Sequence, residues 1–229
     1  MTLRLSGGRR LQSPPGTTAR PTAARVRQAV LNLLATDLPG CRWLDLCCGS
    51  GVMACEALQR GASDLVAIES DRRVAAVARA NLESVAAGLG SPQPRLRVIQ
   101  ADARRWLASH APSSGRGGGT PAVASRADAG GAVAPGSSAM DPAGGVARVE
   151  KTEGVEAERP FDLIYCDPPW PAGLHLPLAE AVARGGWLCA GGTLVWECPS
   201  NEVPIPPEGW IIRDQRRYGG STVVLLEQI

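Results

Sequence analysis

Short apolar runs alternate with helical patterns along most of this chain, and this alternation constrains the fold more than any other feature. Strands are predicted at 43–46, 65–69, 96–100, 161–166 and 193–197. Helices are predicted at 22–35, 52–60, 71–88 and 174–184, with a short one that begins at residue 102. Such alternation favours an α/β fold built on a parallel sheet with helices on both faces. Residues 210–213 and 221–227 predict a closing antiparallel pair.

Composition argues against a membrane protein. Hydrophobic residues make up 44% and charged residues 20% of the 229 residues, and no apolar run approaches the roughly 20 residues that cross a bilayer. The N-terminus shows no secretion signal. The seven cysteines are therefore expected to be reduced thiols in a cytoplasmic protein, which we expect to be a monomer.

Positive charge is concentrated at the N-terminus, although the net charge of the chain is only +2. Six arginines precede the first acid, Asp37: Arg4, Arg9, Arg10, Arg20, Arg25 and Arg27. We expect residues 1–36 to form a basic segment with a helix, capped by Pro21 and Thr22, and residues 37–229 to form the main domain. The basic segment is interpreted as an arm for nucleic-acid phosphates, and the alternative is a solvated basic tail.

Residues 111–159 differ from the rest of the chain. They are rich in Gly, Ala, Ser, Pro and charged residues and contain no Leu, Ile, Phe, Tyr or Trp. Such a segment cannot bury enough apolar surface to offset the entropy of ordering it. We expect a disordered or loosely ordered surface insertion.

A glycine-rich turn follows the first predicted strand of the main domain. Gly49, Gly51 and Ala54 match the dinucleotide pattern G-x-G-x-x-A, so this turn is compatible with a nicotinamide enzyme and with a methyltransferase. Glu69 ends the next strand, where a carboxylate can accept hydrogen bonds from both ribose hydroxyls of an adenosine. Asp102 follows the third strand, and it is expected either to accept from the adenine amine or to cap the next helix.

The sequence Asp167-Pro168-Pro169-Trp170 follows the fourth strand and is the most specific signal in the chain. Two prolines provide no N–H donors, so this turn presents carbonyls and the Asp167 carboxylate, all of which are acceptors. An exocyclic amine is a poor nucleophile until acceptors hold its hydrogens and turn its lone pair toward an electrophile. Trp170 would stack on the base. The alternative is a structural Pro-rich loop in which Trp170 covers the core.

Other reactive residue types are few. The two histidines, His110 and His175, show no metal-ligand spacing, and no metal is expected. His175 is interpreted as a bystander, and Cys47, Cys48, Cys55 and Cys166 as small core residues.

With these motifs in order, the chain resembles the bacterial 16S ribosomal RNA guanine-N2 methyltransferase family. The match runs almost end to end, except for the insertion. It rests on Arg4-Leu5-Ser6-Gly7-Gly8, Arg20-Pro21-Thr22, Val26-Arg27, Asn32, Leu44-Asp45, Gly49-Ser50-Gly51, Ile68-Glu69, Asp71 and Asp167 to Trp170. The sequence departs from the family at Cys47-Cys48, where relatives tend to have an aromatic and a small residue, and in a shorter N-terminal glycine segment.

The resemblance implies a class I, Rossmann-like methyltransferase with a mostly parallel seven-stranded sheet and a small basic N-terminal extension. It implies S-adenosylmethionine as cofactor, held by Asp45, Gly49, Ser50, Gly51, Glu69, Asp102 and Ala103. Asp167, Pro168, Pro169 and Trp170 would carry catalysis, and the six N-terminal arginines would bind ribosomal RNA or the small ribosomal subunit. The alternatives are methylation of adenine N6 or of a protein amide, a nicotinamide-dependent oxidoreductase, and a catalytically silent RNA-binding relative.

Overall fold

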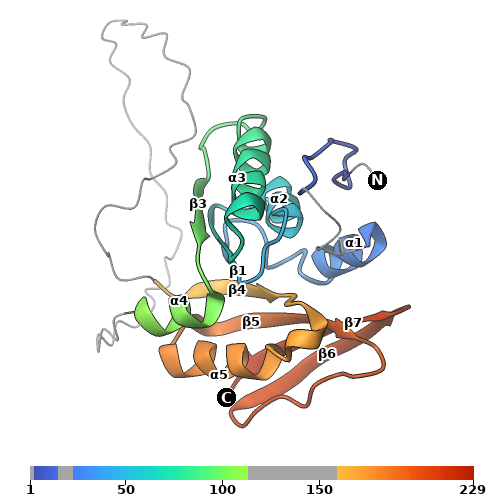
Figure 1. Cartoon of the computed structure of the whole chain (residues 1–229), viewed down its shortest axis with the longest axis vertical. Coiled ribbons are helices and arrows are strands. Elements are labelled where there is room, and N and C mark those ends of the chain that lie inside the picture. The colour runs from blue at the N-terminus through green and yellow to red at the C-terminus, as the bar shows by residue number, and fades with distance from the viewer. Residues whose placement is uncertain (1–2, 15–22, 113–158) are drawn as a thin grey trace, which may run out of the picture.

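The computed structural model of the chain describes residues 3–14, 23–112 and 159–229 and contains one seven-stranded sheet (Figure 1). The strands are β1 (Arg42–Asp45), β2 (Asp64–Glu69), β3 (Arg95–Gln100), β4 (Phe161–Cys166), β5 (Leu188–Pro199), β6 (Trp210–Tyr218) and β7 (Ser221–Gln228). The helices are α1 (Ala24–Leu33), α2 (Val52–Gln59), α3 (Arg72–Ala86), α4 (Ala103–Ser109), the short 3-10 helix η1 (Trp170–Ala172) and α5 (His175–Gly185). The expected insertion, at 113–158, and the helix cap at Pro21 and Thr22 lie outside the described residues.

The strand order is β3-β2-β1-β4-β5-β7-β6. Strands β1 to β5 pair in parallel, whereas β7 runs antiparallel to β5 and to β6. The chain therefore winds outward from β1 to the β3 edge and then returns to place β4 against the other side of β1. Ligands of open α/β sheets bind where the order reverses in this way, outside the carboxyl ends of the strands.

Helices cover both faces of the sheet, which confirms the predicted α/β architecture (Figure 1). One core contains residues of α1, α2 and α3, and the other contains residues of α4 and α5. Successive strand residues point to opposite faces, so Trp43 of β1 lies in the first core and Leu44 in the second. No helix in the described part of the chain is long and apolar enough to cross a membrane.

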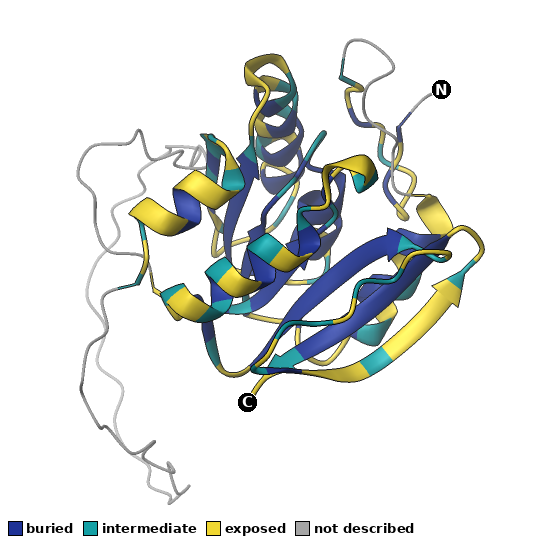
Figure 2. Ribbon diagram, turned by 60° about the horizontal axis from the view of Figure 1, so that its bottom comes forward, coloured by how far each residue is buried: buried dark blue, intermediate teal, exposed yellow. Residues whose placement is uncertain are grey.

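Strands β5 and β6 are longer than predicted by several residues. Strand β5 begins at Leu188, but the register between β4 and β5 shifts between Phe161 and Leu163. Gly191, with φ of 75°, lies in this irregular part, so the alternating pattern becomes recognisable only from Thr193. Strand β6 extends to Tyr218 as an exposed edge beside the buried β7 (Figure 2). Its charged residues hide the apolar pattern, and charge is typical of edge strands.

Residues 3–12 form a small hairpin, which we call the N-terminal hairpin. Arg4 and Arg10 form an isolated antiparallel bridge, and the Leu11 amide donates to the Leu3 carbonyl over 2.9 Å. Leu3, Leu5 and Leu11 are buried in the same core as α1, α2 and α3. The basic start of the chain therefore packs against the main domain.

Candidate active site

Four acids follow four adjacent parallel strands and meet at one edge of the sheet. Asp45 ends β1, Glu69 ends β2, Asp102 follows β3 and Asp167 follows β4. The register pairs Asp45 with Tyr165, and Glu69 with Gln100. The cofactor residues predicted from the sequence and the loop that begins at Asp167 therefore lie at the same edge of the sheet. In the chain, the glycine turn lies between Asp45 and Glu69.

The glycine turn requires glycine at two positions. Gly49 and Gly51 have φ angles of 53° and 75°, which side-chain-bearing residues rarely adopt. A Cβ on Gly51 would also lie 3.3 Å from Cα and Cβ of Ala78, because α3 packs directly on the turn. Gly51 precedes α2, which has no side-chain cap and no acid in its first turn. The turn therefore brings bare backbone and the positive end of a helix to the sheet edge.

Asp45 is a buried carboxylate at the end of β1. It is 1% exposed, and neither of its oxygens has a hydrogen-bond partner in the part of the chain that the structure describes. Burial, and then the negative charge of Asp167, raises the pKa of Asp45 well above its usual value, and the nearby amides of Cys47 and Ala54 offset this only in part. A buried acceptor without a donor is costly. Asp45 therefore suits a ligand that brings donors or positive charge.

Glu69 is held in place by two backbone amides, one in the glycine turn and one two residues further along the chain. Its Oε2 accepts from the Gly49 amide over 3.0 Å, and its Oε1 accepts from the Asp71 amide over 2.8 Å. Oε1 also accepts from the Ser70 hydroxyl over 3.3 Å, an exposed contact that a ligand hydroxyl can replace, and Oε2 can accept a second hydrogen bond. Glu69 can thus receive two ribose hydroxyls while its orientation is fixed.

Asp102 has the cap role that was one of its two expected roles. Its Oδ1 accepts from the Arg105 amide over 3.0 Å at the start of α4. This contact uses one of its two oxygens, so a second acceptor stays at the sheet edge beside Glu69. Ala103, the first residue of α4, packs against the core that also touches Cys47.

One of the acceptors expected in the loop after β4 is used within the loop itself. The Pro169 carbonyl accepts from the Ala172 amide over 2.9 Å, which closes the η1 turn. The Asp167 carboxylate and the Pro168 carbonyl precede that turn and are the acceptors of this loop nearest β4. Trp170 is partly exposed and lies outside both buried cores. We call residues 167–170 the acceptor loop.

Tyr165 of β4, Glu197 of the neighbouring β5 and His175 of α5 form a buried hydrogen-bonded group that was not singled out as functional. The Tyr165 hydroxyl donates to Glu197 Oε2 over 2.8 Å in a buried pair, and Tyr165 stacks on Trp43 with ring centroids 5.9 Å apart. His175 Nε2 lies 2.8 Å from the Glu197 carbonyl oxygen. Burial lowers the pKa of His175, which is therefore a neutral donor. Glu197 ends a predicted strand as Asp45 and Glu69 do, so the same signal could have identified it.

The N-terminal arginines differ in what they can offer to RNA. Arg27 was expected among the arginines that contact RNA phosphates, but it is 3% exposed and pairs with Glu56 over 3.5 Å. Arg9 donates to the Ser84 carbonyl, and Arg4 donates to Gly8 within the hairpin turn. Arg10 and Arg25 are exposed, and Arg20 lies outside the described residues. The predicted basic arm is thus partly a set of structural contacts.

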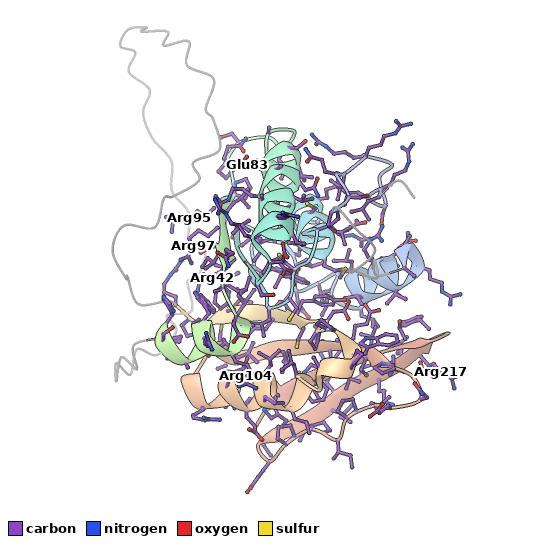
Figure 3. The ribbon with its side chains drawn as sticks, viewed as in Figure 1. Arg42, Glu83, Arg95, Arg97, Arg104 and Arg217 are labelled. Carbon is purple, nitrogen blue, oxygen red and sulfur yellow. The ribbon has the colours of Figure 1, made fainter. Side chains whose placement is uncertain are left out.

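Arginines also lie at both edges of the sheet. Arg95 and Arg97 stand on β3, and Arg217 stands on β6 at the opposite edge (Figure 3). Arg95 and Arg217 are exposed, so positive surface charge is not restricted to the N-terminus.

A hollow lies at the end of the sheet opposite the candidate active site, but it offers no reactive group. It measures about 370 Å³ and lies beside Asp37, Cys41 and Asp162, where β1 and β4 begin. Burial raises the pKa of Cys41 to about 12, so this thiol is not a nucleophile at neutral pH. No group of acids, histidines or cysteines in the described residues could hold a metal ion.

Comparisons with known proteins identify the family of the chain. A family described as "Conserved hypothetical protein 95" matches residues 5–114 and 145–227. The ribosomal RNA small subunit methyltransferase D of Escherichia coli K12 is 25% identical over 213 residues, which cover 93% of this chain and 81% of that protein.

Solved structures share the fold. The Escherichia coli protein yhhF has a TM-score of 0.66 at 23% identity and covers all of this chain and 98% of its own. A Thermus thermophilus 16S rRNA N2 G1207 methyltransferase, solved with AdoMet and guanosine, has a TM-score of 0.57 at 14% identity over all of this chain and 50% of its own. The fold is thus that of class I methyltransferases. The chain belongs to the Conserved hypothetical protein 95 family, and its resemblance to the small-subunit ribosomal RNA methyltransferase D family is confirmed.

Proposed function

We propose that this protein is an S-adenosylmethionine-dependent methyltransferase that transfers a methyl group to the exocyclic N2 amine of a guanine in 16S ribosomal RNA. The observation that carries the proposal is the meeting of two acceptor sets at one sheet edge. Asp45 and Glu69 follow β1 and β2, and the acceptor loop follows β4, the other neighbour of β1.

The cofactor half of the site suits S-adenosylmethionine. The positive φ of Gly49 and Gly51 allows close approach of a ligand to the backbone, and Glu69 offers a fixed carboxylate to the ribose. The buried Asp45 carboxylate, whose oxygens have no hydrogen-bond partner among the residues that the structure describes, fits the donors and positive charge of the amino-acid part. When bound, the cofactor supplies an activated methyl group, so the protein needs no nucleophilic side chain and no metal ion for this transfer.

The acceptor half of the site suits an aromatic amine. The lone pair of the guanine N2 amine is delocalised into the ring until its two hydrogens are held by acceptors. The Asp167 carboxylate and the Pro168 carbonyl would hold these hydrogens, and Trp170 would stack on the base at about 1 to 3 kcal/mol. Fixing the amine beside the methyl group supplies much of the rate enhancement by proximity. The proton leaves the nitrogen after transfer and can pass to Asp167 or water.

Ribosomal RNA is the proposed partner because the protein resembles an rRNA methyltransferase along nearly its whole length. Within the expected basic segment, Arg10 and Arg25 are the exposed candidates for phosphate contact, whereas Arg27 is excluded by its burial. Reversing the charge at Arg10 and Arg25 should weaken RNA binding and flatten its salt dependence.

The test is methyl transfer from labelled S-adenosylmethionine to unmodified 16S RNA, as free RNA and as small-subunit particles. Digestion and mass spectrometry should find the label as N2-methylguanosine at one position. RNA in which inosine replaces that guanosine lacks the amine and should take no label. Label in N6-methyladenosine or in ribosomal protein would favour the other amine acceptors. Absence of transfer to either form of the RNA would refute the proposal.

A nicotinamide-dependent oxidoreductase is the weaker alternative. The glycine turn and Glu69 would suit its cofactor equally well. That function leaves the acceptor loop without a role, and binding of NADH but not of S-adenosylmethionine would support it.

A further inference from the structure

Asn81 of α3 lies between the N-terminal hairpin and the glycine turn and is bonded to both. Its Oδ1 accepts from the Gln12 amide over 2.8 Å. Its Nδ2 donates to the Gln12 carbonyl over 3.0 Å and to the Ser50 carbonyl over 2.9 Å. Asn81 is only 2% exposed, and both of its N–H donors are used. One buried amide therefore joins the end of the hairpin to the residue between Gly49 and Gly51.

A second buried side chain holds the other end of the hairpin to the helix that follows the same turn. Glu56 of α2, which is 1% exposed, accepts from the Ser6 amide over 2.8 Å and from the Ser6 hydroxyl over 2.9 Å. Arg27 pairs with Glu56 and donates to the Arg4 carbonyl over 2.6 Å. The hairpin is thus fixed to α2 and α3, the two helices that contact the glycine turn.

The turn cannot shift without disturbing these contacts. Ala78 of α3, one helical turn before Asn81, lies so close to Gly51 that a Cβ added to this glycine would be 3.3 Å from it. Moving Ser50 would leave a buried donor of Asn81 unpaired, which is unfavourable because the donor has lost its contact with water. A ligand that orders the turn therefore also favours the hairpin position seen here, and the reverse holds by linkage.

We propose that Asn81 is a positioning residue that couples the cofactor-binding turn to the N-terminal hairpin, so that bound cofactor holds the hairpin in place for RNA. The RNA part of this inference rests on the proposed function. The coupling between turn and hairpin concerns the protein and its cofactor alone, and it is tested without RNA.

The experiment is hydrogen–deuterium exchange of the full chain with and without S-adenosylhomocysteine. In the wild type, the cofactor product should slow exchange of the Ser6 and Gln12 amides about 5-fold or more, a typical coupling. In Asn81→Ala, which must show a cooperative melting transition, this slowing should disappear. Asn81→Asp keeps the acceptor for Gln12 but replaces the donor to Ser50, so it should also lose the slowing. It takes the place of Asn81→Ala if the alanine variant does not fold.

Ser6→Ala is the matched control. It removes one bond between the hairpin and Glu56 but leaves Ser50 untouched. Its hairpin should exchange faster in both states and still be slowed by S-adenosylhomocysteine. A wild-type hairpin whose exchange ignores the ligand would overturn the proposal, as would an Asn81→Ala or Asn81→Asp protein that keeps the full effect.

RNA binding extends the same test. S-adenosylhomocysteine should tighten the affinity of the wild type for 16S RNA about 5-fold or more and leave that of Asn81→Ala unchanged. If exchange is coupled but no RNA is methylated, the proposed function fails and the coupling stands. If RNA is methylated but exchange is uncoupled, the role of Asn81 fails and the proposed function stands.

Discussion

Replacing Arg27 with methionine separates a structural from an RNA-binding role for this arginine. In the structure its side chain is buried, pairs with Glu56 over 3.5 Å and donates to the Arg4 carbonyl over 2.6 Å. Methionine keeps the length of the side chain but removes the charge and the donors. The Glu56 carboxylate would then stay buried with only the two hydrogen bonds from Ser6.

The expected cost follows from leaving a buried charge unpaired. Breaking such a pair from one side costs about 3 to 5 kcal/mol, and the retained Ser6 contacts place this case near the lower value. For a protein of this size, about 3 kcal/mol corresponds to a loss of about 6 to 12 °C in Tm. Adding Glu56→Gln should recover much of the loss, because the neutral amide is less costly to bury.

The assay is thermal and urea unfolding of Arg27→Met, Glu56→Gln and the double variant, analysed as a double-mutant cycle. Arg25→Met on the same helix is the control, because Arg25 is exposed and should change stability by no more than about 0.5 kcal/mol. Below the melting range, Arg27→Met should bind RNA as the wild type does. An unchanged Tm together with weaker RNA binding would refute the structural role of Arg27.

The remaining predictions concern Asp167, Glu69 and Asp45 at the sheet edge and His175 of α5. Asp167→Ala should lower kcat about 100-fold because the amine is no longer positioned, while calorimetry should find the Kd of the cofactor nearly unchanged. Glu69→Ala should raise the Kd of the cofactor about 10-fold or more and change the single-turnover rate less. The raised pKa of Asp45 means that the folded protein holds this proton more tightly than the unfolded chain, so Asp45 lowers stability as pH rises above 3.8. Asp45→Asn should therefore raise Tm at about pH 8 and weaken cofactor binding. An unchanged Tm would contradict the burial argument. The lowered pKa of His175 means that stability is lost as pH falls below 6.5; His175→Gln should reduce that loss in unfolding curves at about pH 5, and an unaltered pH dependence would contradict it.

The bounds of strands and helices could be predicted from the sequence wherever the apolar pattern was regular. The β4 bounds, Phe161–Cys166, agree with the prediction, and α2 and β3 differ from theirs by one residue. The pattern failed where tertiary contacts override it. Strand β5 is interrupted opposite the start of β4, and β6 is a charged edge strand that pairs only with β7.

The sequence by itself determined the order of strands and helices and the chemistry available after each strand. Glycines in a turn, acids after strands and a proline pair after β4 are local features, because each depends on a few neighbouring residues. Only the tertiary structure decided how those features are used. Arg27 is buried because Glu56 and Arg4 meet it from distant parts of the chain, and Asn81 is a link because Gln12 and Ser50 approach it from two segments. A residue's charge and hydrogen-bonding groups are encoded locally, but its partners are set by packing.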